Sequence, residues 1–432
     1  MSRVILRIAV LASVVALVTP SSGFAQGTRL LRQPTISADD VAFIYAGDLW
    51  IADRAGGDAR RLTSTPAVES DPHFSPDGRT LAFSSNRSGA PAVYVMGIEG
   101  GTSTRLTWYP AAARARGWTP DGSRVLYASG REVAPNPVNR LWTVAMSGGP
   151  SELIPAPWGF DGDFSSDGAG IAVDPMSRWD VEWRNYRGGQ NTPIILLDLN
   201  TLEETRLPNE RTTDTQPVWM GDRVFFLSDR DFATNVWSYD TGSGALAQMT
   251  YFVDADAKYL SGGDGMLVVE QDGWIHILDP NTAETRRMDI TATGDFPWAQ
   301  ARWRDLSTSV QSASLSPTGQ RALIGARGEI FTVPTDNGDP RNLTRSSDAH
   351  DRTPVWSADG SQIAWFSNDG DGYVLKIGSQ DGLTEPRVLS IGESKLATVP
   401  TWSPDGERIA FVDYRSRLQV VELESGDITT AD

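Results

Sequence analysis

Histidine could carry acid–base chemistry near neutral pH, and this chain has three, His73, His276 and His350. A Ser–His–Asp hydrolase needs its histidine beside a serine nucleophile, often presented on a Gly-x-Ser-x-Gly turn. The three lie in "PHFSPDG", "WIHILD" and "SDAHDR", and none accompanies such a turn. The chain has no cysteine, which excludes thiolate nucleophiles and disulfides. We therefore expect three structural or exposed histidines and no catalytic residue.

Asp369 and Asp371, in "SNDGDGYV", have the alternate spacing of calcium-loop ligands. The third ligand and the later glutamate of such a loop are missing. We therefore expect a hairpin turn here rather than a metal site. No glycine-rich phosphate loop follows a strand and opens a helix, so we expect no metal and no cofactor.

The strands and turns that would position any functional site belong to a repeated sequence unit. Six stretches share a short strand, a turn of the Ser-Pro-Asp-Gly type and an alternating strand. They are "HFSPDGRTLAF" (73–83), "GWTPDGSRVLY" (117–127), "DFSSDGAGIAV" (163–173), "SLSPTGQRALI" (314–324), "VWSADGSQIAW" (355–365) and "TWSPDGERIAF" (401–411). A third strand, a glycine turn and an outer strand complete each unit. Four-stranded units of about 40 residues that stack around an axis form a β-propeller.

Nine copies of this unit fit the chain. They span about 34–63, 70–107, 114–154, 160–207, 215–250, 256–290, 309–344, 351–390 and 397–429. Propellers usually hold four to eight blades, so we divide the copies at 291–308, which matches no repeat. The prediction is an all-β chain, with a six-bladed propeller at 26–290 and three blades of a second propeller at 309–432. Three blades leave faces uncovered, so we expect either a truncated chain or a partner that supplies the rest.

The longest insertion within a blade is "DPMSRWDVEWRNYRGGQ", at 174–190. Its tryptophans and arginines favour protein or peptide contacts if the loop is exposed. Alternatively, Trp179 and Trp183 pack against the neighbouring blade while Arg184 and Arg187 act as hydrogen-bond fasteners.

Composition restricts the partners. The 432 residues are 40% hydrophobic and include 15 tryptophans, enough for real cores. The formal net charge is −17. Such a surface repels nucleic acids and anionic membranes, so we expect neither as a partner.

The N-terminus carries the features of a secretory signal. Arg3 and Arg7 precede an apolar run at 8–18, and the small residues Gly23 and Ala25 follow. The run is shorter than the roughly 20 residues needed to span a bilayer. We expect a signal peptide at 1–25, cleaved after Ala25, and a periplasmic or secreted protein. The alternative is an uncleaved anchor.

Three stretches resemble tricorn protease and its bacterial homologs: "LLRQPTISADDVAFIYAGDLWIAD", "RLTWYP" and "VEWRNYRGGQNTPIILLDL". The signature W-[KR]-x-Y-R-G-G is matched by Trp183, Arg184, Tyr186, Arg187, Gly188 and Gly189. The resemblance implies a six-bladed propeller and a seven-bladed one, then a helical-β segment, a PDZ domain and a serine-peptidase core, in a homo-oligomer. The catalytic serine, histidine and glutamate would then lie beyond this chain.

The family binds the C-terminal carboxylate of a peptide with basic side chains between blades two and three. The resemblance assigns this role here to Arg114 and Arg116, in the expected loop "YPAAARARGW". The family's pair is adjacent and lies in a longer loop. The alternative is two solvated loop arginines.

Two functions follow. The first is the propeller region of a secreted or periplasmic tricorn-like serine peptidase, which guides peptides to and from a C-terminal catalytic core. The alternative is a stand-alone periplasmic propeller resembling TolB, acting as a protein- or peptide-binding scaffold without catalysis.

Overall fold

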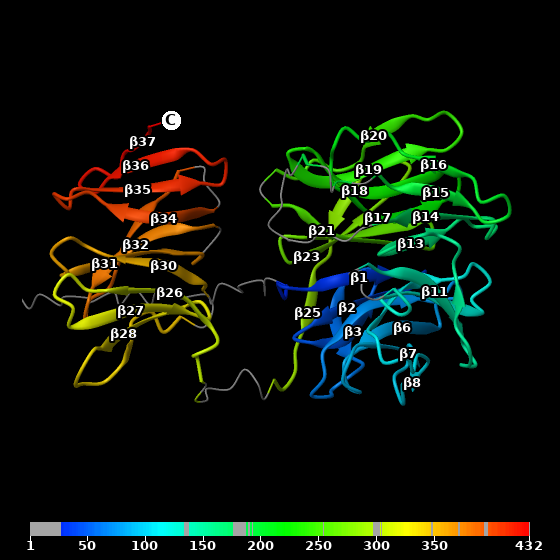
Figure 1. Cartoon of the computed structure of the whole chain (residues 1–432), viewed down its shortest axis with the longest axis horizontal. Coiled ribbons are helices and arrows are strands. Elements are labelled where there is room, and N and C mark those ends of the chain that lie inside the picture. Colours follow the sequence, from blue (N-terminus) through cyan, green and yellow to red (C-terminus); the bar gives the residue numbers. More distant parts are fainter. Residues whose placement is uncertain are drawn as a thin grey trace, which may run out of the picture. The chain divides into compact units, whose positions relative to one another are not determined.

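The computed structural model describes residues 27–133, 138–175, 187–188, 191, 193–253, 255–296, 303, 305–346, 349–369, 372–392 and 396–431. These residues form one sheet of five strands and eight sheets of four. The chain divides into two compact units, Met1–Pro297 and Trp298–Asp432 (Figure 1). Within the described part of the chain, no helix has the length and apolar character that crossing a bilayer requires.

Six sheets make up the first unit, and each contains a consecutive antiparallel meander of four strands. The first three blades are β1 (Arg32–Ile36), β2 (Asp40–Tyr45), β3 (Asp48–Asp53) and β4 (Gly57–Arg61); β5 (Glu69–Phe74), β6 (Thr80–Ser85), β7 (Ala92–Gly97) and β8 (Thr104–Arg105); β9 (Ala113–Trp118), β10 (Arg124–Ser129), β11 (Arg140–Ala145) and β12 (Glu152–Leu153). The next three are β13 (Asp161–Phe164), β14 (Gly170–Asp174), β15 (Ile195–Asp198) and β16 (Glu204–Arg206); β17 (Asp214–Met220), β18 (Arg223–Asp231), β19 (Ala233–Asp240) and β20 (Leu246–Gln248); β21 (Ala257–Gly263), β22 (Met266–Gln271), β23 (Trp274–Leu278) and β24 (Thr285–Arg287).

The six blades close into a ring. Each innermost strand contacts the innermost strand of the next blade, and β21 of blade six contacts β1 of blade one. A separate hydrophobic cluster fills each of the six junctions between neighbouring blades. Stacking thus buries both faces of every blade, which explains why the unit repeats. The predicted six-bladed propeller is confirmed.

The ring closes through a strand that the sequence analysis divided between the propeller and the linker. β25 (Ile290–Ala292) pairs in parallel with β4, as the fifth strand of the first sheet. Ile290 is fully buried in the cluster between blades six and one. Thr28 N donates to Ile290 O at 2.7 Å, which attaches the N-terminal segment to the same junction between blades six and one. The first propeller therefore continues through Ala292 instead of ending at residue 290.

The recurring turns have one chemistry. In the first of them, Ser75 Oγ donates to Asp77 Oδ1 at 2.5 Å, and the same oxygen accepts from Arg79 N at 3.1 Å. Gly78 follows with a φ of 71°, which glycine adopts without steric cost. Asp121, Asp167, Asp359 and Asp405 each accept a backbone N–H two residues further on in the same way. Local sequence thus sets the first hairpin of these blades.

The second unit contains three further meanders. They are β26 (Val310–Leu315), β27 (Arg321–Ala326), β28 (Glu329–Pro334) and β29 (Arg341–Asn342); β30 (Asp351–Trp356), β31 (Gln362–Ser367), β32 (Val374–Ser379) and β33 (Arg387–Ser390); β34 (Ala397–Trp402), β35 (Arg408–Asp413), β36 (Leu418–Glu422) and β37 (Ile428–Thr430). Two hydrophobic clusters join them in sequence. β26 is almost entirely exposed. The predicted three blades of a second propeller are therefore present as an open row.

Candidate functional site

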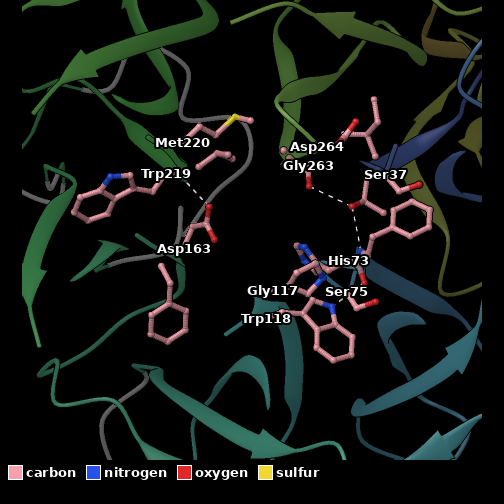
Figure 2. A pocket seen from close by; sticks show the side chains of 18 of the residues that line it. Ser37, His73, Ser75, Gly117, Trp118, Asp163, Trp219, Met220, Gly263 and Asp264 are labelled. Carbon is pink, nitrogen blue, oxygen red and sulfur yellow. Dashed lines mark hydrogen bonds between the residues drawn. The ribbon is translucent and has the colours of Figure 1, made fainter. Parts of the chain in front are cut away.

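A cavity of about 590 Å³ lies on the axis of the six-bladed propeller. Its lining comes from the innermost strands of all six blades and from the turns that follow them, where it opens. Figure 2 shows Asp163 and His73 entering it from different blades. The rim includes Asp77 and Asp264, and the aromatic lining residues are Phe74, Trp118, Phe164 and Trp219. The lining residues that lie farthest from the turns along their strands include Arg116, Asp161, Gln216 and Tyr259.

Arg116 fixes the floor of this cavity. Its Nη1 donates to Asp71 Oδ1 at 2.8 Å, across the junction with blade two. Its Nε donates to the carbonyl of Phe160 at 2.8 Å, across the junction with blade four. Burial acts to raise the pKa of Asp71, but Arg116, Ser70 and Arg114 together hold it below its ordinary value. The floor is thus a buried, hydrogen-bonded ion pair that ties three blades together.

Two further carboxyl groups line the cavity from one strand. Asp161 and Asp163 occupy alternate positions of β13, so their side chains leave the same face of the strand. Arg116 Nε lies 3.8 Å from Asp161 Oδ1, and Asp163 Oδ2 accepts the backbone N–H of Trp219 at 2.8 Å. Burial raises the pKa of Asp161 to about 6 and that of Asp163 to about 7. Both carboxyls therefore lack full compensation by a cation.

His73 and Tyr259 face each other across the cavity floor, with 3.5 Å between His73 Nε2 and Tyr259 Oη. Burial lowers the pKa of His73 to about 4. Burial also raises the pKa of Tyr259 well above its ordinary value. Both groups are therefore neutral at pH 7, and the ionised groups of the floor are Arg116 and carboxylates.

The raised pKa of Asp163 predicts a pH dependence of stability. A carboxyl whose pKa is higher in the folded than in the unfolded state stabilises the fold while protonated, and this contribution is lost as pH rises through the folded-state value. We expect the unfolding free energy of the native protein, minus that of Asp163→Asn, to fall between about pH 4 and pH 7. The slope is at most about 1.4 kcal/mol per pH unit. Above pH 7 the difference becomes constant.

Urea unfolding of both proteins at half-unit pH steps measures this difference. Asparagine keeps an oxygen that can accept the Trp219 N–H, so the variant removes the titration and retains the hydrogen bond. The difference cancels His73, whose lowered pKa acts in the opposite direction and costs stability as pH falls from about 6.5 to 4. A difference that does not change with pH would contradict the prediction.

The two arginines expected in a loop lie in strand β9, which is a correction to the sequence analysis. Arg116 is buried and Arg114 is half-exposed, with its Nη1 3.7 Å from Asp71 Oδ2. β9 pairs regularly with β10 except at a bulge near Gly117. This pairing holds the segment in an extended strand conformation, although its sequence is polar and shows no strand pattern. A peptide carboxylate at Arg116 would have to replace Asp71.

The signature segment is described in part. Arg187 Nη1 donates to Asp229 Oδ1 at 3.0 Å, and the Asp229 side chain is fully buried in blade five. This ion pair links blades four and five. Gly188 accepts the Asn191 N–H at 3.3 Å. Trp179, Trp183, Arg184, Tyr186 and Gly189 lie outside the described residues.

The other candidate residues take structural positions. His276, on β23, packs edge-on against Phe252 with ring centroids 5.3 Å apart. His350 Nδ1 lies 3.2 Å from Tyr373 Oη. Asp369 pairs with Lys376 Nζ at 2.8 Å, while Asp371 lies outside the described residues.

The sequence analysis missed the axial cavity, although a signal for it exists. One position in the first hairpin strand of each blade, three or four residues before the strand ends, lies near the axis, and it carries a polar side chain in five of the six blades. These residues are Gln33, Asp71, Asp161, Gln216 and Tyr259. Gln33, Asp71 and Gln216 have φ values near 50° at bulges that interrupt the pairing of their strands. Comparing the repeats position by position would have singled them out.

Known proteins match the chain as follows. The family described as "Tricorn protease N-terminal beta propeller domain" matches residues 28–284. Tricorn protease homolog 1 of Streptomyces coelicolor is 30% identical over 418 residues, covering 93% of this chain and 38% of the relative. Tricorn protease of Thermoplasma acidophilum is 25% identical, covering 70% of this chain and 28% of the relative.

A solved structure also matches. The crystal structure of the tricorn protease aligns with a TM-score of 0.56 and 21% identity, covering 94% of this chain and 39% of that chain. At this identity the likeness concerns the fold. The chain spans about two fifths or less of the length of these relatives.

Proposed function

This chain belongs to the tricorn protease family, and from that premise we propose that it is the propeller region of a secreted or periplasmic tricorn-like serine peptidase. In this proposal the six-bladed propeller receives peptides and guides them to or from a catalytic core outside this chain. The PDZ and peptidase domains of the same polypeptide are its partners, and the complete protein forms a homo-oligomer.

The axial cavity is the observation that carries the peptide-handling role. Its volume of about 590 Å³ falls in the range of sites that enclose small ligands or a few residues of a chain. Aromatic walls and a few buried polar groups are the lining that such sites use. A peptide would enter at the turn side, where Ser166 and Gly221 form exposed parts of the rim.

Narrowing this rim tests the role. We expect Ser166→Trp to weaken binding of a fluorescein-labelled pool of mixed hexapeptides about tenfold or more, because the indole occupies the mouth of the cavity. Fluorescence anisotropy with the whole 432-residue chain measures the Kd. Ser166→Ala is the matched control and should bind as the native protein does. Equal Kd values for all three proteins would contradict entry through this mouth.

Export is a separate part of the proposal, and it rests on the residues at 1–25. We expect the protein recovered from its source cells to begin at Gln26. N-terminal sequencing of the mature protein decides this. A chain that still begins at the initiator methionine and stays with the cytoplasm would contradict it.

A stand-alone binding scaffold is the second candidate. Large apolar side chains are exposed in the loops between one blade's outer strand and the next blade's inner strand, and this candidate function would use them as partner contacts. They are Val68, Trp108, Tyr109, Trp158, Tyr251 and Val253. An antibody against the first propeller separates the candidates on an immunoblot of source cells. A band much larger than 432 residues supports the peptidase, and a band at that size supports the scaffold.

A further inference from the structure

We propose that the axial cavity binds the cationic end of a peptide, either its α-ammonium group or a lysine or arginine side chain. This inference rests on the proposed peptide-handling function and deepens it. The receiving groups are the carboxylates of Asp161 and Asp163, and Trp219, the partly exposed aromatic side chain of the lining, contacts the adjoining part of the peptide. The cavity therefore prefers a positively charged ligand, whereas a receptor for a peptide carboxylate prefers a negatively charged one.

The charge balance of the lining carries the argument. Arg116 is the cation among the lining residues, and its Nη1 is already engaged by Asp71 at 2.8 Å. Its side chain is 5% exposed, so it has little surface to offer a ligand. Asp161 and Asp163 then remain as acceptors: Arg116 Nε lies 3.8 Å from Asp161 but donates to Phe160 O, and Asp163 accepts the backbone N–H of Trp219. An anionic ligand would meet two carboxyls and a guanidinium that is already paired.

The burial of Asp161 and Asp163 strengthens the preference for a cationic ligand. A carboxylate removed from water is costly unless it is paired, and such a group takes up a proton in the absence of a cation. The raised pKa values of Asp161 and Asp163 follow from this burial. An ammonium or guanidinium group at hydrogen-bond distance would supply the missing positive charge. Charge-assisted hydrogen bonds of this kind are about twice as strong as neutral ones.

The aromatic walls fit the same ligand class. Trp118 donates its indole N–H to His73 O at 3.0 Å, and Trp219 donates its own to Gly221 O at 3.1 Å. Both indoles are thereby held in place, which lowers the entropy cost of binding. Tryptophan faces attract ammonium and guanidinium groups through their quadrupole. Figure 2 shows Trp219 near Asp163 and Trp118 near His73.

The depth of the cavity selects an end rather than a passing chain. Gln33 N donates to Glu270 Oε2 at 2.8 Å, and neither residue is among the described residues that line the cavity. Arg116, Asp161, Gln216 and Tyr259 are lining residues that lie far from the open turns along their strands, and the Arg116 side chain is 5% exposed. A peptide must therefore insert a terminus or a single long side chain, with its charge near β13.

Five tetrapeptides, each carrying the same fluorescein group through a C-terminal amide, test the inference on the whole chain. One has a free N-terminus and only alanine, one is acetylated with a single lysine, and one is acetylated with only alanine, which is neutral apart from the label. The fourth is acetylated with a single glutamate, and the fifth combines a free N-terminus with a lysine. We expect at least one cationic peptide to bind about tenfold or more tightly than the neutral one, as a charged hydrogen bond implies. The peptide that binds identifies the source of the charge.

Variants locate the effect. Asp163→Asn should reduce the preference for the cationic peptide to about threefold or less. Asp161→Asn is the second variant, used if the first does not fold. Asp222→Asn removes an exposed carboxylate in the neighbouring turn between β17 and β18, outside the cavity lining, and should leave the preference unchanged. Loss of the preference in Asp222→Asn as well would mean a diffuse surface charge effect, which overturns the assignment.

The remaining outcomes separate this inference from the function on which it rests. Equal binding of all five peptides would overturn the charge preference and leave peptide handling in place. Tighter binding of the glutamate peptide would overturn the charge preference in sign. Binding of none of the five, nor of the mixed hexapeptide pool, would overturn both.

Discussion

Replacing Arg116 with alanine is expected to destabilise the first propeller by about 3–5 kcal/mol, the cost of removing one partner of a buried ion pair. The substitution leaves Asp71 buried without its 2.8 Å partner and Asp161 without its nearest cation. It also removes the hydrogen bond from Arg116 Nε to Phe160 O, which joins blades three and four. Urea unfolding followed by tryptophan fluorescence and circular dichroism measures the change.

Arg114→Ala is the matched control, two residues away on the same strand. Its guanidinium is 45% exposed and lies 3.7 Å from Asp71, so we expect a change of at most about 1 kcal/mol. Asp71→Asn in the Arg116→Ala background should recover part of the loss, because it removes the uncompensated buried charge. Equal effects of Arg114→Ala and Arg116→Ala would show that the cavity floor is not the buried pair described here.

Gly263→Ala is expected to destabilise the same propeller by about 1–3 kcal/mol or more, the usual range for overpacking a well-packed region. A Cβ at this position would come within 2.1 Å of Ile36 O. That oxygen belongs to the backbone of β1, while Gly263 ends β21, so the clash falls on the junction between blades six and one. The backbone must move there to relieve it, and the junction also holds β25 and the cluster around Ile290.

Gly242→Ala tests whether the effect comes from the clash. The nearest atom to a Cβ at Gly242 is Asp240 Oδ1 at 3.6 Å, an ordinary contact with a side chain. We expect a change within about 0.5 kcal/mol, as for other surface substitutions. Thermal unfolding and limited proteolysis of both variants provide the comparison. A Gly263→Ala protein as stable as Gly242→Ala would mean that blades six and one do not approach as closely as the structure places them.

Much of the fold could be predicted from the sequence because the signals are local. The Ser-Pro-Asp-Gly turns place a serine, an aspartate and a glycine within four residues, and these groups bond to one another and to the adjacent backbone. The period of two along each strand then shows which side chains face the neighbouring blades. Blade number and the division into six and three follow from these short-range patterns.

Only the tertiary structure determined which residues meet in the axial cavity and how β25 closes the ring. Arg116 meets Asp71 and Phe160, which are 45 and 44 residues away, only because inner strands of successive blades converge on an axis. β25 has three residues, too few for a recognisable alternation, and it becomes a strand because β4 offers an unpaired edge on the ring. Local sequence patterns determine how each blade folds. Which side chains of the inner strands meet in the axial cavity depends on how the ring closes. For that reason the sequence by itself determined the blades, and the three-dimensional structure determined where chemistry can occur.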